Sequence, residues 1–167
     1  MKDDRQAFQD FTAAHGARLF RTAYFLAGGD WHLAEDLTQE ALVKVFVAWR
    51  RVSRVENPAA YAQTVLTRTF ISQRRRKRST EQPIAEPPER GIEDVDSAVR
   101  LTLLAELANL SVRDRAVVVL RYWEDLSVEE VASVLNISSA SVRTQSSRAL
   151  GRLRVALGEV FPERLLG

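Results

Sequence analysis

The segment 79–97, STEQPIAEPPERGIEDVDS, constrains the fold of this chain more than any other, because it cannot contribute to a core. It contains six acidic residues, one arginine, three of the five prolines of the chain and few large apolar side chains. Such a composition buries too little apolar surface to repay the entropy lost on ordering. We therefore expect a flexible acidic linker, extended by its prolines, between two modules at 5–78 and 98–157.

Both modules are expected to be helical, so the predicted fold class is all-α, with a bundle of three to four helices followed by a four-helix domain. The hydrophobic content of 46% suffices for two small cores. No segment has strand-like alternation of useful length, and no run of about 18 apolar residues could cross a membrane. The absence of cysteine excludes disulfides, thiolate zinc sites and thiol nucleophiles. We expect a cytoplasmic protein that does not insert into membranes.

Helix signals divide the first module into three helices, at about 4–27, 31–51 and 58–78. A glycine pair ends the first helix, and Asp30 is placed to cap the second. Asn57 precedes a proline at the first turn of the third helix, where the missing N–H costs nothing. The aromatic residues at helical spacing are expected to lie in the core: Phe46, Trp49, Tyr122 and Trp123.

The second module contains a helix-turn-helix signal behind two helices at 97–109 and 112–123. Ser127 and Glu130 form a capping box for a short helix at 128–135, and a basic helix begins at about Ser139. Two helices joined by so tight a turn, with apolar residues that meet at their crossing, are typical of a helix-turn-helix. In that motif the second helix presents its amino-terminal turns to the DNA major groove.

The basic helix has the chemistry of a DNA reader. Residues 138–154 contain four arginines and no acid, and cations on an approaching helix gain free energy by releasing the counterions of DNA. Arg143 is suited to guanine and Gln145 to adenine. The alternative is an ordinary solvated helix face, but the capped helix and the turn before it favour DNA contact.

A second basic block precedes the linker. Residues 50–78 contain nine lysines or arginines and one acid, Glu56, and five of the cations are consecutive at 74–78. Two basic modules on one tether suggest that two separated DNA elements are bound together, with the linker setting their effective concentration.

The chain resembles the extracytoplasmic-function (ECF) family of bacterial RNA polymerase sigma factors over about residues 5–157, particularly an actinobacterial branch. The segment AEDLTQEALVKVFVAW is similar to the polymerase-binding segment of that family, and NPAAYAQTVLTRTFISQRRRKR to its −10-recognition helix. The segment LSVEEVASVLNISSASVRTQSSRALGRLR looks like its −35-binding helix-turn-helix. The order and spacing of the three segments make the resemblance specific.

This resemblance implies three sets of binding residues. The −35 duplex would meet Ser139, Ser141, Arg143, Thr144, Gln145, Ser147 and Arg148. The −10 strand would meet a base-capturing loop, a helix face and a phosphate-binding cluster: Val52, Ser53, Arg54 and Asn57; Gln63, Thr64, Thr67, Arg68 and Ile71; and Arg74, Arg75, Arg76 and Lys77. Core polymerase would dock on Asp36, Gln39, Glu40 and Val43. From the sequence alone, the third set also fits a solvated helix face, and the basic cluster a disordered tail.

Two positions depart from the usual family pattern. Arg68 stands where asparagine is common, and Gln145-Ser146 where a basic residue followed by an aliphatic one is common. We therefore expect an unusual promoter sequence and a stronger dependence on the polymerase for affinity.

The expected function is promoter recognition, DNA melting and transcription initiation without catalytic chemistry. The implied partners are core RNA polymerase, through its clamp coiled coil and flap, promoter DNA in duplex and single-stranded form, and an anti-sigma protein. The linker would either enter the active-site cleft of the polymerase or act as a spacer. No cofactor is expected, and His15 and His32 are too isolated for a metal site. A decoy that sequesters an anti-sigma protein and a dimeric repressor or activator are the alternatives; an enzyme has no supporting constellation.

Overall fold

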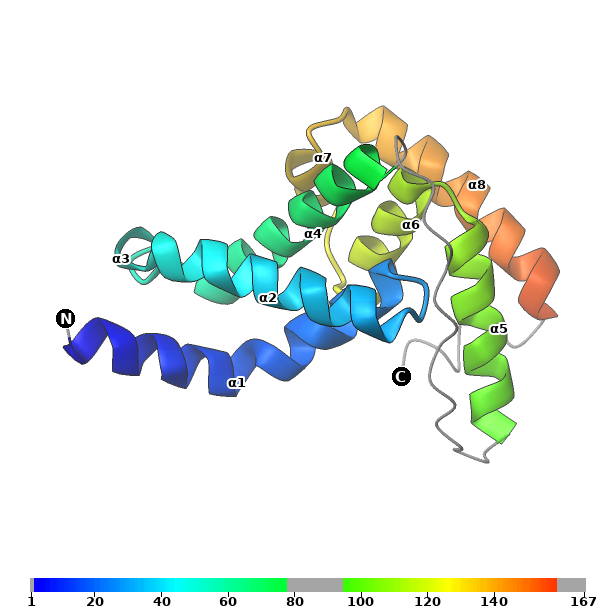
Figure 1. Ribbon diagram of the computed structural model, residues 1–167. Helices are drawn as coiled ribbons and strands as arrows, with labels where there is room; N and C mark the ends of the chain where they lie inside the picture. Colours follow the sequence, from blue (N-terminus) through cyan, green and yellow to red (C-terminus); the bar gives the residue numbers. More distant parts are fainter. Residues whose placement is uncertain (1, 78–94, 159–167) are drawn as a thin grey trace.

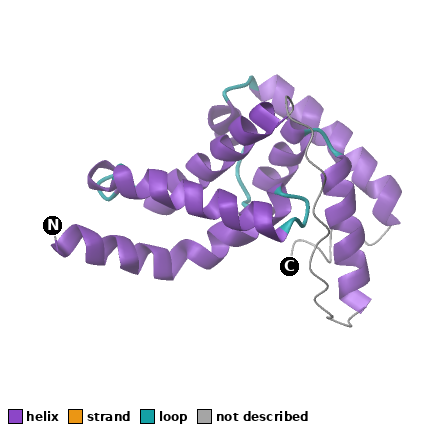
Figure 2. Ribbon diagram, in the orientation of Figure 1, coloured by secondary structure: helices purple, strands orange, loops and turns teal. Residues whose placement is uncertain are grey.

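The computed structural model describes residues 2–77 and 95–158, and every regular element in those two stretches is helical (Figure 2). This confirms the predicted all-α class. Most of the predicted linker, from 79 to 94, lies outside the described residues.

The first half consists of α1 (Lys2–Leu26), α2 (Trp31–Val47), the short α3 (Trp49–Val52) and α4 (Pro58–Lys77). The glycine pair after α1 has positive φ values of 63° and 89°, and Asp30 then caps α2 by accepting a hydrogen bond from Leu33 N at 3.1 Å. The Asn57 side chain caps α4 through Ala60 N at 3.0 Å. Helices α1, α2 and α4 pack on one another around a buried apolar core: Leu19, Leu26, Leu37, Val45, Leu66 and Phe70.

The second helix is shorter than expected. It ends at Val47, Ala48 leaves the helical geometry with φ −95° and ψ 11°, and α3 follows directly. Trp49 is 6% exposed and lies 5.2 Å from the ring of Phe11, as expected for a core residue. The core prediction for Phe46 is wrong: its side chain is 49% exposed, because it lies one residue, about 100° of helix, from the buried stripe.

The second half consists of α5 (Val95–Asn109), α6 (Val112–Val118), the π-helical turn η1 (Val119–Trp123), α7 (Val128–Leu135) and α8 (Ser139–Leu157). The capping box of Ser127 and Glu130 is present at the start of α7. Asn136 adopts the left-handed conformation with φ 55°, which ends α7 and turns the chain into α8. The helix-turn-helix predicted from the sequence therefore has the expected boundaries.

The two halves lie against each other. Helices α1 and α4 contact α6, η1 and α7, and α8 covers the far side of the second half (Figure 1). A Cβ atom added to Gly28 would stand 2.8 Å from the Cβ of Ala108, so only glycine permits this approach. The rings of Phe25 and Trp123 stack across the boundary with centroids 4.8 Å apart.

Candidate nucleic-acid and polymerase interfaces

The amino-terminal turns of α8 gather most of the residues predicted to read the −35 duplex. Ser138 caps the helix, accepting a hydrogen bond from Ser141 N at 3.1 Å. Ser139, Ser141 and Gln145 are half-buried, whereas four predicted residues are exposed: Arg143, Thr144, Ser147 and Arg148. Because residues separated by four positions share one side of a helix, these four form a single polar surface of the kind that enters a major groove.

Arg143 is only loosely held within this surface. Its Nη2 atom lies 3.6 Å from Oε1 of Glu129, and the two side chains are 62% and 70% exposed. Exposed ion pairs contribute little to stability, so the guanidinium is free to exchange this carboxylate for DNA.

Arg148 is held much more firmly. Its Nη2 donates to Oδ1 of Asp114 at 2.9 Å and its Nε to Oδ2 at 3.2 Å, and the Asp114 side chain is only 4% exposed. These hydrogen bonds raise the pKa of Arg148 and connect α8 to α6. The sequence showed Asp114 only in the first turn of α6 and gave no sign of this partner.

The predicted base-capturing loop presents only part of its side chains to solvent. Val52 is fully buried, whereas Ser53, Arg54 and Asn57 are exposed. Asn57 already serves as the cap of α4, and the Ser53 hydroxyl donates to the carbonyl of Arg50 at 3.3 Å, so Arg54 is the exposed cation that this loop presents.

The predicted strand-binding face of α4 is mixed. Gln63, Thr64, Ile71 and Arg74 are half-buried, Arg68, Arg75 and Arg76 are exposed, and the Lys77 side chain lies outside the described residues. Thr67 is fully buried, and its hydroxyl donates to the carbonyl of Gln63 at 2.9 Å. In this arrangement of the chain, Thr67 therefore cannot touch a ligand.

Arg68 joins α4 to the helix-turn-helix. Its Nε donates to the carbonyl of Val134 at 3.0 Å, and its Nη2 donates to the carbonyl of Ser133 at 3.3 Å. Both acceptors belong to the last turn of α7, where the carbonyl of Ser133 also accepts a long hydrogen bond from Asn136 N at 3.4 Å.

Arg115 of α6 makes a buried connection of the same kind. Its Nη1 donates to the carbonyl of Leu26 at 2.8 Å, at the end of α1, and its Nη2 donates to the carbonyls of Ala108 and Leu110. Burial and the neighbouring Arg74 lower the pKa of Arg115 to about 10, so the guanidinium stays charged at neutral pH. The one signal in the sequence for this contact was that Arg115 directly precedes the apolar run 116–120.

The ring of Phe70 lies between two cations. The guanidinium carbons of Arg115 and Arg74 are 5.7 and 5.9 Å from its centroid. Arg74, predicted to bind phosphate, is therefore partly committed to an aromatic contact inside the molecule.

Glu124 provides a third polar connection between the halves. Its carboxylate accepts from the Thr22 hydroxyl at 2.6 Å and from Nη2 of Arg18 at 3.1 Å. The Glu124 side chain is 9% exposed and that of Arg18 is 66% exposed. Sequence reasoning missed this cluster because its members lie about 100 residues apart.

The predicted polymerase-docking residues lie on one side of α2. Asp36, Gln39 and Val43 are exposed, whereas Glu40 is half-buried, forms an ion pair with Lys44 at 3.4 Å and accepts a hydrogen bond from Gln73. Beyond Val43 the surface continues into apolar side chains that the sequence prediction omitted, Phe46 and Val47, which are 49% and 81% exposed. The docking surface is thus acidic at one end of α2 and apolar at the other.

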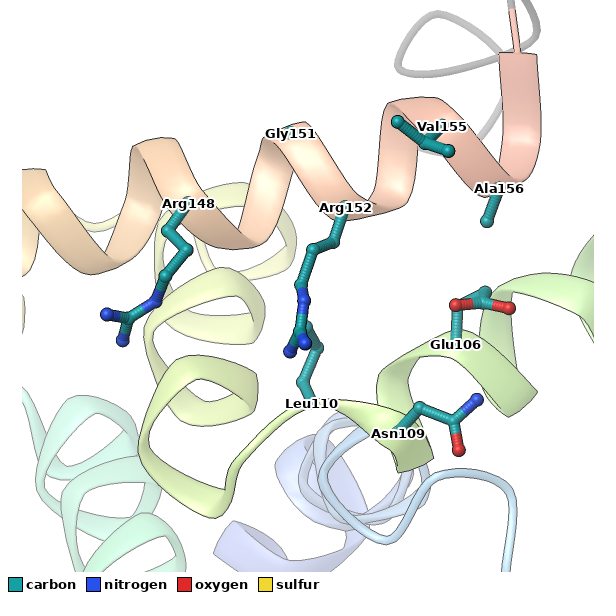
Figure 3. A pocket seen from close by; sticks show the side chains of 8 residues that line it. All are labelled: Glu106, Asn109, Leu110, Arg148, Gly151, Arg152, Val155 and Ala156. Carbon is teal, nitrogen blue, oxygen red and sulfur yellow. The ribbon is translucent and has the colours of Figure 1, made fainter.

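A shallow groove of about 600 Å³ separates the end of α8 from α5. In Figure 3, Arg152 points from α8 toward Leu110, just past the end of α5, and Val155 follows along α8, whereas Arg148 points toward α6, where Asp114 binds it. Val155 is 89% exposed, so the groove has an apolar end and a basic end.

Within residues 2–77 and 95–158, no three histidine or acidic side chains are grouped closely enough to hold a metal ion. No helix in the same two stretches is long and apolar enough to cross a membrane.

Comparison with known proteins matches two family models to the two halves of the chain. Sigma-70 region 2 matches residues 11–80, and Sigma-70 region 4 matches residues 100–153. The chain is 33% identical to the RNA polymerase sigma-E factor of Streptomyces coelicolor over 90% of its own length and 85% of that protein. It is 32% identical to the ECF RNA polymerase sigma factor SigL of Mycobacterium tuberculosis, over 87% and 86% of the two chains.

The chain belongs to the ECF sigma factors of the sigma-70 family. This membership confirms the resemblance read from the sequence and the expectation of a transcription initiation factor without catalytic activity. The fold agrees with two solved structures. RpoE of Bartonella quintana, bound to the anti-sigma factor NepR, has a TM-score of 0.71, 24% identity and coverage of 92% of this chain and 98% of that one. CnrH, bound to the cytosolic domain of CnrY, has a TM-score of 0.62, 21% identity and coverage of 92% and 88%.

Proposed function

We propose that this sigma factor uses α8 to read the −35 duplex and the loop before α4, with α4 itself, to hold the −10 strand. The observation that carries the proposal is the exposed polar surface at the start of α8, behind a capped turn and opposite the core of its own half. The proposed division of the chain is 5–78 for the −10 module, 79–97 for the linker and 98–157 for the −35 module.

Within the −35 surface we assign the reading of bases to Arg143 and Thr144, and an orienting role to Arg148. Arg143 can exchange Glu129 for guanine, whereas Arg148 is anchored on a buried carboxylate. The side-chain oxygen of Gln145 is buried without a hydrogen-bond partner, a group that a donor on DNA would satisfy once the side chain turned outward.

Within the −10 surface, the exposed Ser53, Arg54 and Arg68 and the half-buried Gln63 and Thr64 would contact bases, and the cluster from Arg74 would contact phosphates. Binding a flipped base on one strand pulls the duplex toward the melted state without any catalytic step.

Core polymerase would dock on the acidic and apolar side of α2, with its clamp coiled coil, and on the groove between α5 and α8, with its flap. The α2 surface lies away from the start of α8, and the groove shares only Arg148 with the −35 surface, so both would leave Arg143 and Thr144 accessible to DNA. The sigma factor RpoE of Bartonella quintana is bound to the anti-sigma factor NepR in its solved structure, and we propose a partner of this class for this chain, acting in the cytoplasm.

The proposal is tested by run-off transcription from genomic fragments with core polymerase, with and without the protein. Discrete new start sites are expected, and their loss with Arg143→Ala but not with Arg154→Ala, an exposed arginine of the same helix, would identify the reading surface. A decoy would give no start sites while still capturing an anti-sigma protein. A dimeric repressor would bind a palindrome tightly without polymerase.

A further inference from the structure

A basic cleft lies beside the end of α4, which contacts both α6 and α7 (Figure 1). The cleft has a volume of about 530 Å³, and four arginines from two helices line it: Arg68, Arg75 and Arg76 of α4, and Arg113 of α6. Pockets for small ligands have volumes of roughly 300–1,000 Å³, so the cleft is large enough to hold a bound molecule.

The positive charge of this cleft is not balanced by the part of the protein that the structure describes. No acidic side chain of the described residues lines the cleft, and Arg68, Arg75 and Arg113 form no ion pair with any of them. Like charges brought close together repel one another. The cleft therefore favours an anion with several negative charges, which can neutralise more than one guanidinium at once.

The arginines of the cleft differ in how firmly they are held. The guanidinium of Arg68 is fixed by hydrogen bonds from its Nε and Nη2 to the carbonyls of Val134 and Ser133, which do not use Nη1. Arg75 and Arg113 are exposed and have no hydrogen-bond partner among the described residues. A planar guanidinium binds phosphate oxygens through two parallel N–H groups. One preorganised and two free arginines thus suit a ligand with linked phosphate groups.

The cleft also has an apolar side. Ile71 and Val134, which are half-buried, line it together with Leu135, which is 8% exposed. The exposed Asn136 adds a side-chain amide that can both donate and accept hydrogen bonds. Inorganic phosphate would leave this side in contact with water, whereas the base and ribose of a nucleotide would cover it and gain free energy from the burial.

We propose that the cleft binds a nucleoside di- or triphosphate, with its phosphates between Arg68, Arg75 and Arg113 and its base against the apolar side. The cleft shares Arg68 and Arg75 with the proposed −10 surface, so a bound nucleotide would compete with the −10 strand for these two side chains. Arg113 belongs to neither of the surfaces assigned to DNA, and a substitution there tests the cleft by itself.

Isothermal titration calorimetry of the full chain with GTP, at physiological ionic strength, tests the site directly. GTP is expected to bind more tightly than inorganic tripolyphosphate, because the base adds apolar contact to the phosphate contacts, and guanosine is expected not to bind. A rise in melting temperature with GTP checks the result independently. Equal affinities for tripolyphosphate and GTP would overturn the nucleoside assignment. The absence of binding in both measurements at millimolar GTP would overturn the site.

Two variants separate a defined site from general attraction to basic side chains. Arg113→Gln is expected to weaken GTP binding at least about fivefold, as the loss of one charge-assisted contact implies, without changing the free energy of unfolding. Arg154→Gln makes the same change of charge at an exposed arginine of α8 that does not line the cleft, and it is expected to leave the affinity within about twofold of the parent value. Equal weakening in the two variants would overturn the cleft as the site.

The titrations contain neither DNA nor polymerase, so their outcome is independent of the proposed function. A chain that binds GTP but gives no run-off transcripts would keep the nucleotide site and lose the promoter assignment. A chain that initiates transcription but binds no GTP would keep the promoter assignment and lose the nucleotide site.

Discussion

Helices α4 and α8 each contain four arginines, yet they use them differently. On α8, Arg143, Arg152 and Arg154 are exposed, and only Arg148 is anchored on a buried carboxylate. On α4, Arg68 donates hydrogen bonds to the end of α7, and Arg74 lies against Phe70. The remaining arginines of the helix, Arg75 and Arg76, are exposed. Equal numbers of cations in a sequence therefore do not mean equal numbers available to DNA.

The largest change in stability is expected at Arg115, whose buried guanidinium donates hydrogen bonds to three backbone carbonyls. Arg115→Met should lower the free energy of unfolding by about 3 kcal/mol, because it leaves buried carbonyls at the ends of α1 and α5 without donors. Urea denaturation followed by circular dichroism measures this change. Arg113→Met, an exposed arginine of the same helix, should change it by less than about 0.5 kcal/mol. Similar losses of unfolding free energy in both variants would show that a buried, hydrogen-bonded arginine contributes no more to stability than an exposed one.

A smaller but specific effect is expected at the free arginine of α8. Arg143→Ala should reduce −35-dependent initiation roughly ten- to a hundredfold, as the loss of one bidentate base contact implies, without lowering the melting temperature. Quantitative run-off assays on templates with and without the −35 element measure it. Equal losses on both templates would place Arg143 outside base recognition.

Arg148→Ala should show the opposite pattern. It removes the partner of buried Asp114 and so should lower the melting temperature more than Arg143→Ala does, with a smaller change in promoter preference. Differential scanning fluorimetry and the same run-off assay measure the two quantities side by side. A variant that is as stable as Arg143→Ala would show that the Asp114 contact carries no structural role.

The basic end of α4 should contribute less than its full charge to DNA binding. If Arg74 stays on Phe70, replacing Arg74, Arg75 and Arg76 by alanine should reduce the salt slope of −10 strand binding by about 1.4, two contacts at about 0.7 each. Fluorescence anisotropy at several salt concentrations, with holoenzyme and a single-stranded −10 oligonucleotide, gives the slope. An unaltered slope would mean that this cluster binds no phosphate.

The smallest effect is expected at the exposed ion pair. Glu129→Gln should change the free energy of unfolding by no more than about 1 kcal/mol, because both side chains of the Arg143 pair are largely exposed. It should also slightly strengthen −35 binding by releasing Arg143. A clear loss of stability in urea denaturation would show that this pair is a structural contact and Arg143 is not free.

Local signals in the sequence were sufficient to predict most helices. Asp30, Asn57 and Ser127 each cap a helix where the sequence predicted a cap, because capping depends on residues within one turn. Ser138 caps α8 at the start that the sequence predicted for this helix. The break at Ala48 and the π-helical turn after α6 were missed, since neither contains a glycine or proline to mark it. Of the candidate residues of α8, Arg143, Thr144, Ser147 and Arg148 share one exposed surface, as 3.6-residue periodicity predicts, whereas Ser139, Ser141 and Gln145 are half-buried.

The sequence could not predict which candidate arginines are free. Arg68, Arg115 and Arg148 find partners on helices distant in the sequence, and the exposure of Phe46 depends on where α2 ends. Contacts of this kind depend on how helices distant in the sequence pack together, and no periodic pattern in the sequence predicts them.

The missing side chain at Gly28 sets how closely the two halves can approach. Its backbone is in the left-handed region with φ 63°, and an added methyl group would collide with Ala108. A single substitution at this position would push the turn after α1 away from α5. The clearance at this one turn therefore decides whether the two helical halves can pack as closely as they do.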